Sequence, residues 1–148
     1  MITKQIGDIA EQAVTLAALQ RGWEVLRPIG DRLAYDLVFD VDGDLFKIQV
    51  KAAWYDQAKD NFVVDNRRTK TNRRKMIRSN YELADFDFAI LYIQALNVFY
   101  IMPCAIFTGY GSEIHLVEST KRQRKPRSAD YREAWQLIEQ RAATEEIP

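Results

Sequence analysis

The segment that decides the fold reads Ala34-Tyr-Asp-Leu-Val-Phe-Asp-Val-Asp-Gly-Asp-Leu-Phe-Lys-Ile-Gln-Val-Lys-Ala52. Its two halves, 34–41 and 45–52, are rich in β-branched and aromatic residues, which favour strands. Asp42-Gly43 between them is a strong signal for a tight turn. We therefore expect two adjacent antiparallel strands joined as a hairpin.

Three polar side chains lie within this apolar hairpin. Asp36 is on the first strand, and Gln49-Val50-Lys51 is on the second. Gln49 and Lys51 are two residues apart, so both point to one face, and Val50 points to the other. Hydrolysis of a phosphodiester needs oxygen ligands for a hard divalent cation and a positive charge near the attacking water. A carboxylate, an amide and an amine supply both, which predicts a metal-dependent nuclease site.

Each of these residues also has a structural interpretation. Asp36, Gln49 and Lys51 are also compatible with ordinary polar positions of an alternating strand. Their apolar neighbours favour function, because a buried charge without a partner is costly. Asp40 shares a face with Asp36 and is a spare ligand candidate.

The order Tyr35-Asp36 and then Gln49-Val50-Lys51 resembles the motif of the PD-(D/E)XK nuclease superfamily. In that motif an acidic residue at a strand end is followed, on the next strand, by Glu or Asp, any residue, and Lys. Here Tyr35 replaces the Pro of the motif, and Gln49 replaces its second acidic residue. The wider resemblance covers essentially the whole chain, including Gly7-Asp-Ile-Ala-Glu11, and is to cyanobacterial group I intron homing endonucleases of this fold. It implies an α/β, restriction-endonuclease-like core, with a central mixed β-sheet flanked by helices.

The resemblance also implies roles for individual residues. Asp36, the side-chain oxygen of Gln49 and the backbone carbonyl of Val50 are expected to hold Mg²⁺, with Glu11 assisting. Lys51 is expected to orient the attacking water and to stabilise charge on the phosphate. Mn²⁺ is expected to substitute for Mg²⁺, and Ca²⁺ to bind without supporting turnover. Periodicity alone makes Glu11 an ordinary exposed carboxylate, so its role depends on the resemblance.

The implied partners are a long double-stranded DNA target and other copies of the chain, in a homotetramer where two subunits each cut one strand. Two alternatives stay open. A structure-selective Holliday junction resolvase would share the fold and site but read DNA shape. A catalytically decayed DNA-binding module is the second alternative, and Gln49 is its main support.

Length and composition are compatible with this interpretation. The chain has 148 residues, of which 47% are hydrophobic and 28% are charged, so we expect one nuclease domain over 1–148. The chain has one cysteine, Cys104, so an intramolecular disulfide is excluded. With a single histidine, His115, in addition, a Cys/His zinc site is also excluded. The sequence has no apolar run near the roughly 20 residues that span a bilayer. We expect a soluble protein of the bacterial cytoplasm.

The formal net charge is zero, but the charges are separated along the sequence. The segments 67–78 and 121–127 hold twelve cations and no anion, whereas the other 129 residues hold nine cations and 21 anions. Such separation suits docking on a phosphate backbone. Solvated loops, or for 121–127 a subunit contact, are the alternatives. The expected DNA-contact residues are Arg67, Arg68, Lys70, Arg73, Arg74, Lys75, Arg78, Lys121, Arg122, Arg124, Lys125 and Arg127.

Hydrophobic patterns predict the remaining elements around one mixed sheet. A helix is expected over 3–21, with an apolar stripe at Ile6, Ile9, Ala10, Ala13 and Ala17. The segment 67–78 has no apolar period and is expected to be irregular. A final helix is expected from about Ala129, with Tyr131, Trp135, Ile138 and Ala142 on one face. Strands are expected at 23–28, 54–55, 61–65, 87–93, 98–102 and 113–117, and a short helix at 103–107.

Overall fold

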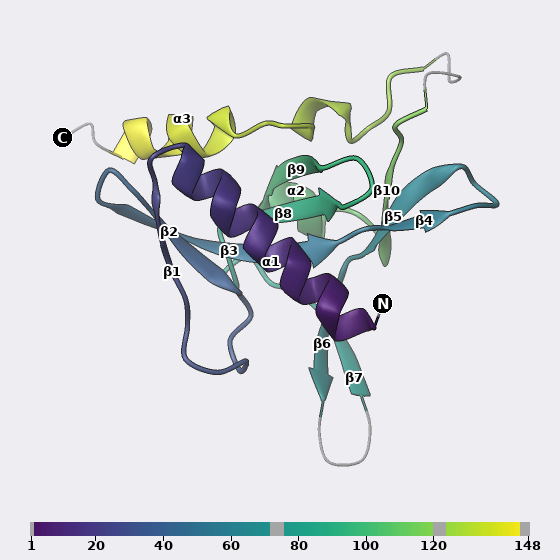
Figure 1. Ribbon diagram of the computed structural model, residues 1–148, viewed down its shortest axis with the longest axis horizontal. Coiled ribbons are helices and arrows are strands. Elements are labelled where there is room, and N and C mark those ends of the chain that lie inside the picture. The colour runs from purple at the N-terminus through teal and green to yellow at the C-terminus, as the bar shows by residue number, and fades with distance from the viewer. Residues whose placement is uncertain (1, 72–75, 120–123, 146–148) are drawn as a thin grey trace.

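Five strands form the central sheet, in the order β1-β2-β3-β8-β9 (Figure 1). The computed structural model describes residues 2–71, 76–119 and 124–145. Strands β3 and β8 are parallel, and the other neighbours in this sheet are antiparallel. The expected central mixed sheet is therefore confirmed. Its strands are β1 (Glu24–Leu26), β2 (Leu37–Val41), β3 (Asp44–Ala52), β8 (Phe88–Ile93) and β9 (Val98–Pro103).

The β2–β3 hairpin forms where the sequence predicts it. Asp42 and Gly43 alone connect the two paired strands. Their φ angles are 55° and 97°, the positive values that a two-residue type I′ turn requires. Strand β2 begins at Leu37, so Asp36 lies directly before the strand.

Helices α1 (Thr3–Gln20) and α3 (Gln136–Glu145) pack on one face of this sheet (Figure 1). The fully buried stripe of α1 is Ala10, Val14 and Ala18, at a spacing of four residues. The predicted stripe was thus displaced by part of a turn, since Ile9, Ala13 and Ala17 are only partly buried. In the described part of the chain, no helix is long and apolar enough to cross a membrane.

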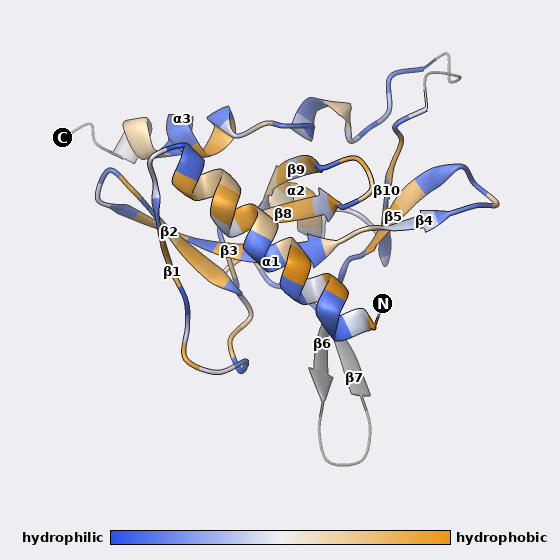
Figure 2. Ribbon diagram, viewed as in Figure 1, coloured by the Kyte–Doolittle hydropathy of each residue, from blue (hydrophilic) through white to orange (hydrophobic). Residues whose placement is uncertain are grey.

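The opposite face of β8 and β9 carries a second hydrophobic core. Helix α2 (Cys104–Thr108) packs there beside a separate sheet of order β10-β5-β4. Strand β8 is buried on both faces and is hydrophobic along much of its length (Figure 2). The prediction of one sheet was wrong, because β4 pairs with β5 and β5 pairs with β10, and not with a strand of the central sheet. The strands of the separate sheet are β4 (Trp54–Asp56), β5 (Asn61–Asp65) and β10 (Glu113–Leu116).

The basic segment 67–78 was also wrongly expected to be irregular. Strands β6 (Arg67–Thr71) and β7 (Met76–Asn80) form an antiparallel hairpin that projects from the rest of the protein (Figure 1). Arg67 pairs with Asn80 at its base. The pairing of the two strands is made by backbone groups, which every residue carries, so it leaves no pattern in the sequence.

The predicted final helix begins later than expected. A single 3₁₀ turn, η1 (Ala129–Tyr131), is followed by a break, and α3 starts at Gln136. Glu133 has a φ of 50°, and its N–H donates to the carbonyl of Phe99 at 2.7 Å. This tertiary hydrogen bond replaces the helical pattern at that point. Trp135, Ile138 and Ala142 share one buried face as predicted. Tyr131, predicted on the same face, packs against the second core instead.

Candidate active site

Asp36 lies at the entrance to β2, and its carboxylate turns back onto β3. The Asp36 N–H donates to the carbonyl of Ile48 at 2.8 Å, next to the β2–β3 ladder. Asp36 Oδ2 accepts hydrogen bonds from the Val50 N–H at 2.8 Å and from Gln49 Nε2 at 2.9 Å. The hairpin therefore brings the two halves of the motif into direct contact.

The amide nitrogen of Gln49 lies between two oxygens. Nε2 donates to Asp36 Oδ2 and, at 3.2 Å, to the carbonyl oxygen of Val50. The expected metal ligand was the side-chain oxygen of Gln49, which does not make these contacts. Rotation about the last side-chain bond exchanges the amide nitrogen and oxygen. Gln49 therefore presents its oxygen at this position only after that rotation.

Burial dominates the electrostatics of Asp36. It raises the pKa of the carboxyl above the ordinary value of 3.8, against the opposing effects of the Val50 N–H and the Lys51 ammonium. Desolvation disfavours the charged form of a carboxyl group, and a hydrogen-bond donor or a cation favours it. The charge on Asp36 is thus only partly compensated by the protein.

Glu11 of α1 lies close enough to Asp36 for the two charges to repel. Burial and then the charge of Asp36 raise the pKa of Glu11 above 4.5, while Arg27 lowers it. Arg27 Nη1 is 3.7 Å from Glu11 Oε1, and Arg27 Nη2 donates to Thr15 Oγ1 at 3.0 Å. Glu11 therefore belongs to the same cluster as Asp36, although it lies beside the buried stripe of its helix.

Lys51 is half-buried and faces away from the core under α1, where its neighbour Val50 packs. Its ammonium donates to the backbone carbonyl of Arg67 at 2.9 Å. The same nitrogen lies 5.1 Å from the centroid of the Tyr81 ring, within range of a cation–π contact. Lys51 is also near enough to Asp36 to lower the pKa of that carboxyl.

The oxygen atoms of this cluster fit a divalent cation. Asp36 Oδ2 and the Val50 carbonyl converge on one hydrogen-bond donor, and hard cations prefer oxygen ligands of these kinds. The repulsion between Asp36 and Glu11 is a further feature that a cation would offset. Among residues 2–71, 76–119 and 124–145, no group of three or more His, Cys, Asp or Glu side chains could hold a metal ion. A site here thus needs the amide and backbone oxygens as well as the carboxylates.

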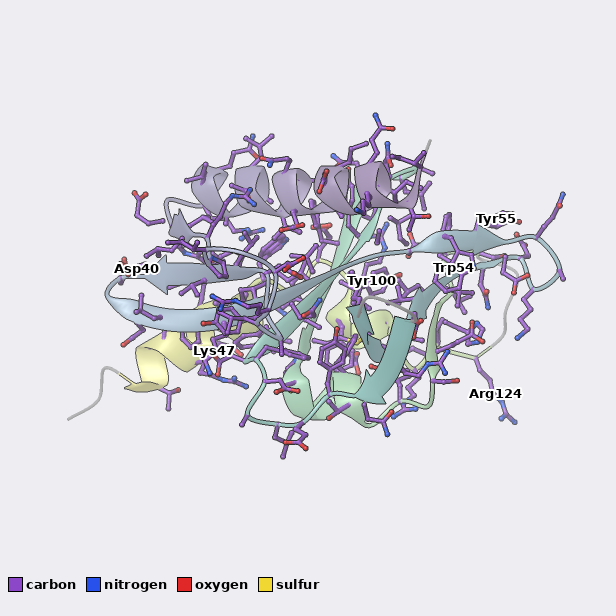
Figure 3. All side chains as sticks on the ribbon, turned by 90° about the horizontal axis from the view of Figure 1, so that it is seen from below. Asp40, Lys47, Trp54, Tyr55, Tyr100 and Arg124 are labelled. Atoms are coloured by element: carbon purple, nitrogen blue, oxygen red, sulfur yellow. The ribbon has the colours of Figure 1, made fainter. Side chains whose placement is uncertain are left out.

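Asp40 has a different role from the spare ligand that its position suggested. Its Oδ1 accepts a hydrogen bond from the Gly43 N–H at 2.8 Å and so supports the β2–β3 turn. Figure 3 shows Asp40 beside that turn.

The described residues of the first basic segment, 67–71 and 76–78, belong to the two strands of the β6–β7 hairpin. Arg67 Nε lies 3.4 Å from Asp65 Oδ1, so this arginine is paired with its own neighbour. The backbones of Arg68, Lys70 and Arg78 belong to the two strands. Arg73, Arg74 and Lys75 lie outside the described residues.

The second basic segment lies elsewhere. Arg124 is exposed (Figure 3), Lys125 is paired with Asp130, and the Arg127 guanidinium lies 3.9 Å from the centroid of the Tyr110 ring. Its described residues, 124–127, lie away from the projecting β6–β7 hairpin (Figure 1). The described parts of the two segments therefore do not form one continuous surface. Lys121 and Arg122 lie outside the described residues.

Sequence reasoning missed the groups that hold the site residues. The pairing of Arg27 with Glu11 has no local sequence signal. The carbonyl of Arg67 and the ring of Tyr81 were not foreseen at all. A backbone carbonyl is the same at every position, and Tyr81 is distant from Lys51 in the sequence.

A family model and a solved structure both match this chain. The family model described as PD-(D/E)XK endonuclease matches residues 1–138. Among solved structures, the chain is similar to a bacterial homing endonuclease, I-Ssp6803I, with a TM-score of 0.93, 57% identity and coverage of 100% of both chains. A comparison with curated proteins finds no match. This chain belongs to the PD-(D/E)XK endonuclease family.

Proposed function

We propose that the protein is a divalent-metal-dependent endonuclease that makes a site-specific double-strand cut in duplex DNA, as a homing endonuclease does. The observation that carries the proposal is the convergence of Asp36 Oδ2, the Gln49 amide and the Val50 carbonyl, with Lys51 close by. The full-length similarity to a protein described as a bacterial homing endonuclease supports this class of nuclease.

The proposed mechanism divides the work among the five groups of the cluster. Asp36, the Val50 carbonyl and the rotated Gln49 amide bind the cation, and Glu11 adds negative charge beside them. When bound, Mg²⁺ supplies positive charge that polarises a phosphoryl oxygen and eases attack by water. The Lys51 ammonium orients the attacking water and stabilises the charge that develops on the scissile phosphate.

Gln49 sets the conditions under which the cation binds. In place of a second acidic residue it keeps an oxygen donor but removes one negative charge. We therefore expect weak metal binding by the free protein and tighter binding once DNA phosphates complete the ligand shell. Mn²⁺ is expected to replace Mg²⁺, and Ca²⁺ to support DNA binding without cleavage.

The β6–β7 hairpin is the proposed DNA-docking element. It is a projecting two-stranded ribbon, a shape that a major groove admits, and the segment 67–78 holds seven cations and no anion. A cut in both strands needs two active sites, or one site acting twice, so a symmetric assembly is expected. A homotetramer with two cutting subunits is the proposed form, and light scattering after gel filtration measures it.

A cleavage assay tests the proposal directly. The protein is incubated with Mg²⁺ and one of three DNAs: a linear duplex that carries the intron insertion sequence, the same duplex with that sequence scrambled, and a four-way junction. Cutting of the first DNA alone is the expected result. Preferential cutting of the junction would indicate a resolvase, and binding without cutting of any DNA would indicate a decayed module.

A further inference from the structure

Two residues at the base of the β6–β7 hairpin, one at the start of β6 and one just after β7, contact the ammonium of Lys51. Arg67, whose carbonyl accepts from Lys51 Nζ at 2.9 Å, is the first residue of β6. Tyr81, whose ring centroid lies 5.1 Å from the same nitrogen, directly follows Asn80, the last residue of β7. Arg67 and Asn80 are paired in the hairpin register. The two contacts therefore come from the base of one element.

The base of this hairpin is held firmly by the second core. The Asn66 side chain donates to the carbonyls of Phe107, Tyr110 and Gly111, at 2.8, 3.1 and 2.8 Å. The Tyr81 ring packs edge-on against Phe86 and Phe107, with centroids 5.3 and 5.8 Å away. Arg67 thus follows a residue with a fixed side chain, and the Tyr81 ring is itself packed in the second core.

A lysine needs such support if its charge is to be placed accurately. Its ammonium sits on a flexible four-carbon chain, and a reacting phosphate requires the charge at one position. A carbonyl acceptor and an aromatic face restrict the ammonium in two directions. Asp36 attracts the ammonium through its charge, and the carbonyl and the ring add two contacts from a different element.

We propose that the base of the β6–β7 hairpin positions Lys51 for cleavage, through the carbonyl of Arg67 and the ring of Tyr81. The inference rests on the proposed function, in which Lys51 acts on the scissile phosphate and the hairpin docks on DNA. Tyr81 is accordingly a positioning residue. The β6–β7 hairpin that docks on DNA therefore also orients the Lys51 ammonium. The position of the hairpin base and the rate of cleavage are thus linked.

The test compares variants at position 81 by single-turnover cleavage with saturating duplex target and Mg²⁺. Tyr81→Leu removes the ring and should slow cleavage about tenfold, the equivalent of one cation–π contact. DNA affinity, measured in Ca²⁺, should stay within about twofold, because the docking residues of the hairpin are unchanged. Tyr81→Phe keeps the ring and should restore the rate.

A packing control and a fluorinated ring separate positioning from stability. Phe86→Leu removes a neighbouring ring from the same cluster, so it should lower the melting temperature without slowing cleavage at a temperature where the protein is folded. A trifluorinated phenylalanine at position 81 keeps the shape of the ring and weakens its attraction for a cation. It should cleave several-fold more slowly than Tyr81→Phe, even if Tyr81→Leu fails to fold.

The Lys51→Met background distinguishes the inference from the proposed function. Tyr81→Leu should add no further loss once the ammonium is absent. The inference is overturned if the fluorinated variant cleaves as fast as Tyr81→Phe, if Phe86→Leu slows cleavage equally, or if the losses of Tyr81→Leu and Lys51→Met multiply. Full activity of Lys51→Met would instead overturn the proposed function, whatever the result at Tyr81.

Discussion

Replacing Asp36 separates its structural role from its proposed chemical role. Both Asp36→Ala and Asp36→Asn remove the buried charge, so the difference between them isolates the hydrogen bonds. Asparagine can place its carbonyl oxygen where Oδ2 now accepts from the Val50 N–H and from Gln49 Nε2. Alanine leaves the Val50 N–H without this acceptor, whereas Gln49 Nε2 keeps the Val50 carbonyl.

The magnitude follows from that single unsatisfied donor. A buried N–H that loses its partner costs roughly 1–3 kcal/mol, so Asp36→Ala should be about 2 kcal/mol less stable than Asp36→Asn. For a chain of this length, that corresponds to a melting temperature about 6 °C lower. Differential scanning calorimetry in metal-free buffer measures the difference.

Cleavage should respond differently to the same pair. Neither variant retains the carboxylate, so both should lose at least about 10² to 10³ in single-turnover rate, despite their unequal stability. Specific DNA binding should survive in both. Equal melting temperatures would refute the hydrogen-bond argument, and a near-normal cleavage rate in Asp36→Asn would refute the assignment of Asp36 as a metal ligand.

Four further predictions follow from the site and the hairpin. Burial raises the pKa of Asp36 above 3.8, because the folded protein favours the neutral carboxyl. The neutral carboxyl stabilises the folded state fully below pH 3.8. This stabilisation is lost as the pH rises through the raised pKa. The melting temperature of the wild type minus that of Asp36→Asn should therefore fall across this window in metal-free buffer, and a rise would contradict the argument. Gln49→Glu restores a carboxylate and should bind Mg²⁺ more tightly by calorimetric titration; weaker binding would count against Gln49 as a ligand. Arg73→Ala and Arg74→Ala should each weaken DNA binding, with at least one reducing the slope of log K against log salt by about one unit in fluorescence anisotropy; unchanged slopes in both would place the docking surface elsewhere. Asn66→Ala leaves three carbonyls without their shared donor and should destabilise the protein by about 2 kcal/mol in urea unfolding, and a loss near zero would show that those contacts contribute little.

Local signals were enough to predict the part of the fold that carries the site. Alternating apolar residues and the Asp42-Gly43 turn fixed both the register of the β2–β3 hairpin and the face shared by Gln49 and Lys51. The contact between Asp36 and Gln49 follows from that register. These features depend on residues that are near one another in the sequence, so they can be predicted from local patterns.

The wrong predictions concern features that depend on distant parts of the chain. The segment of the β6–β7 hairpin has no apolar period, and its antiparallel pairing is visible only in the structure. The late start of α3 depends on the contact between Glu133 and Phe99 on β9. The separate sheet depends on the pairing of β5 with β10, two strands that are far apart in the sequence.

The same distinction applies to the site. Asp36, Gln49 and Lys51 could be predicted because they share one hairpin. Glu11 depended on a family resemblance, since it lies outside the apolar stripe of its helix. Its approach to Asp36 is a packing result, set by how α1 lies on the sheet.

The central claim is that this cluster cleaves DNA with a divalent cation, and one comparison tests it most directly. Single-turnover cleavage of the intron insertion duplex is measured for the wild type and Lys51→Met, each with Mg²⁺ and with EDTA, after equal DNA binding has been established in Ca²⁺. The wild type should cut both strands only with Mg²⁺, and Lys51→Met should bind equally and cut at least about 10² times more slowly. Cutting in EDTA, or a Lys51→Met rate equal to that of the wild type, would contradict the claim.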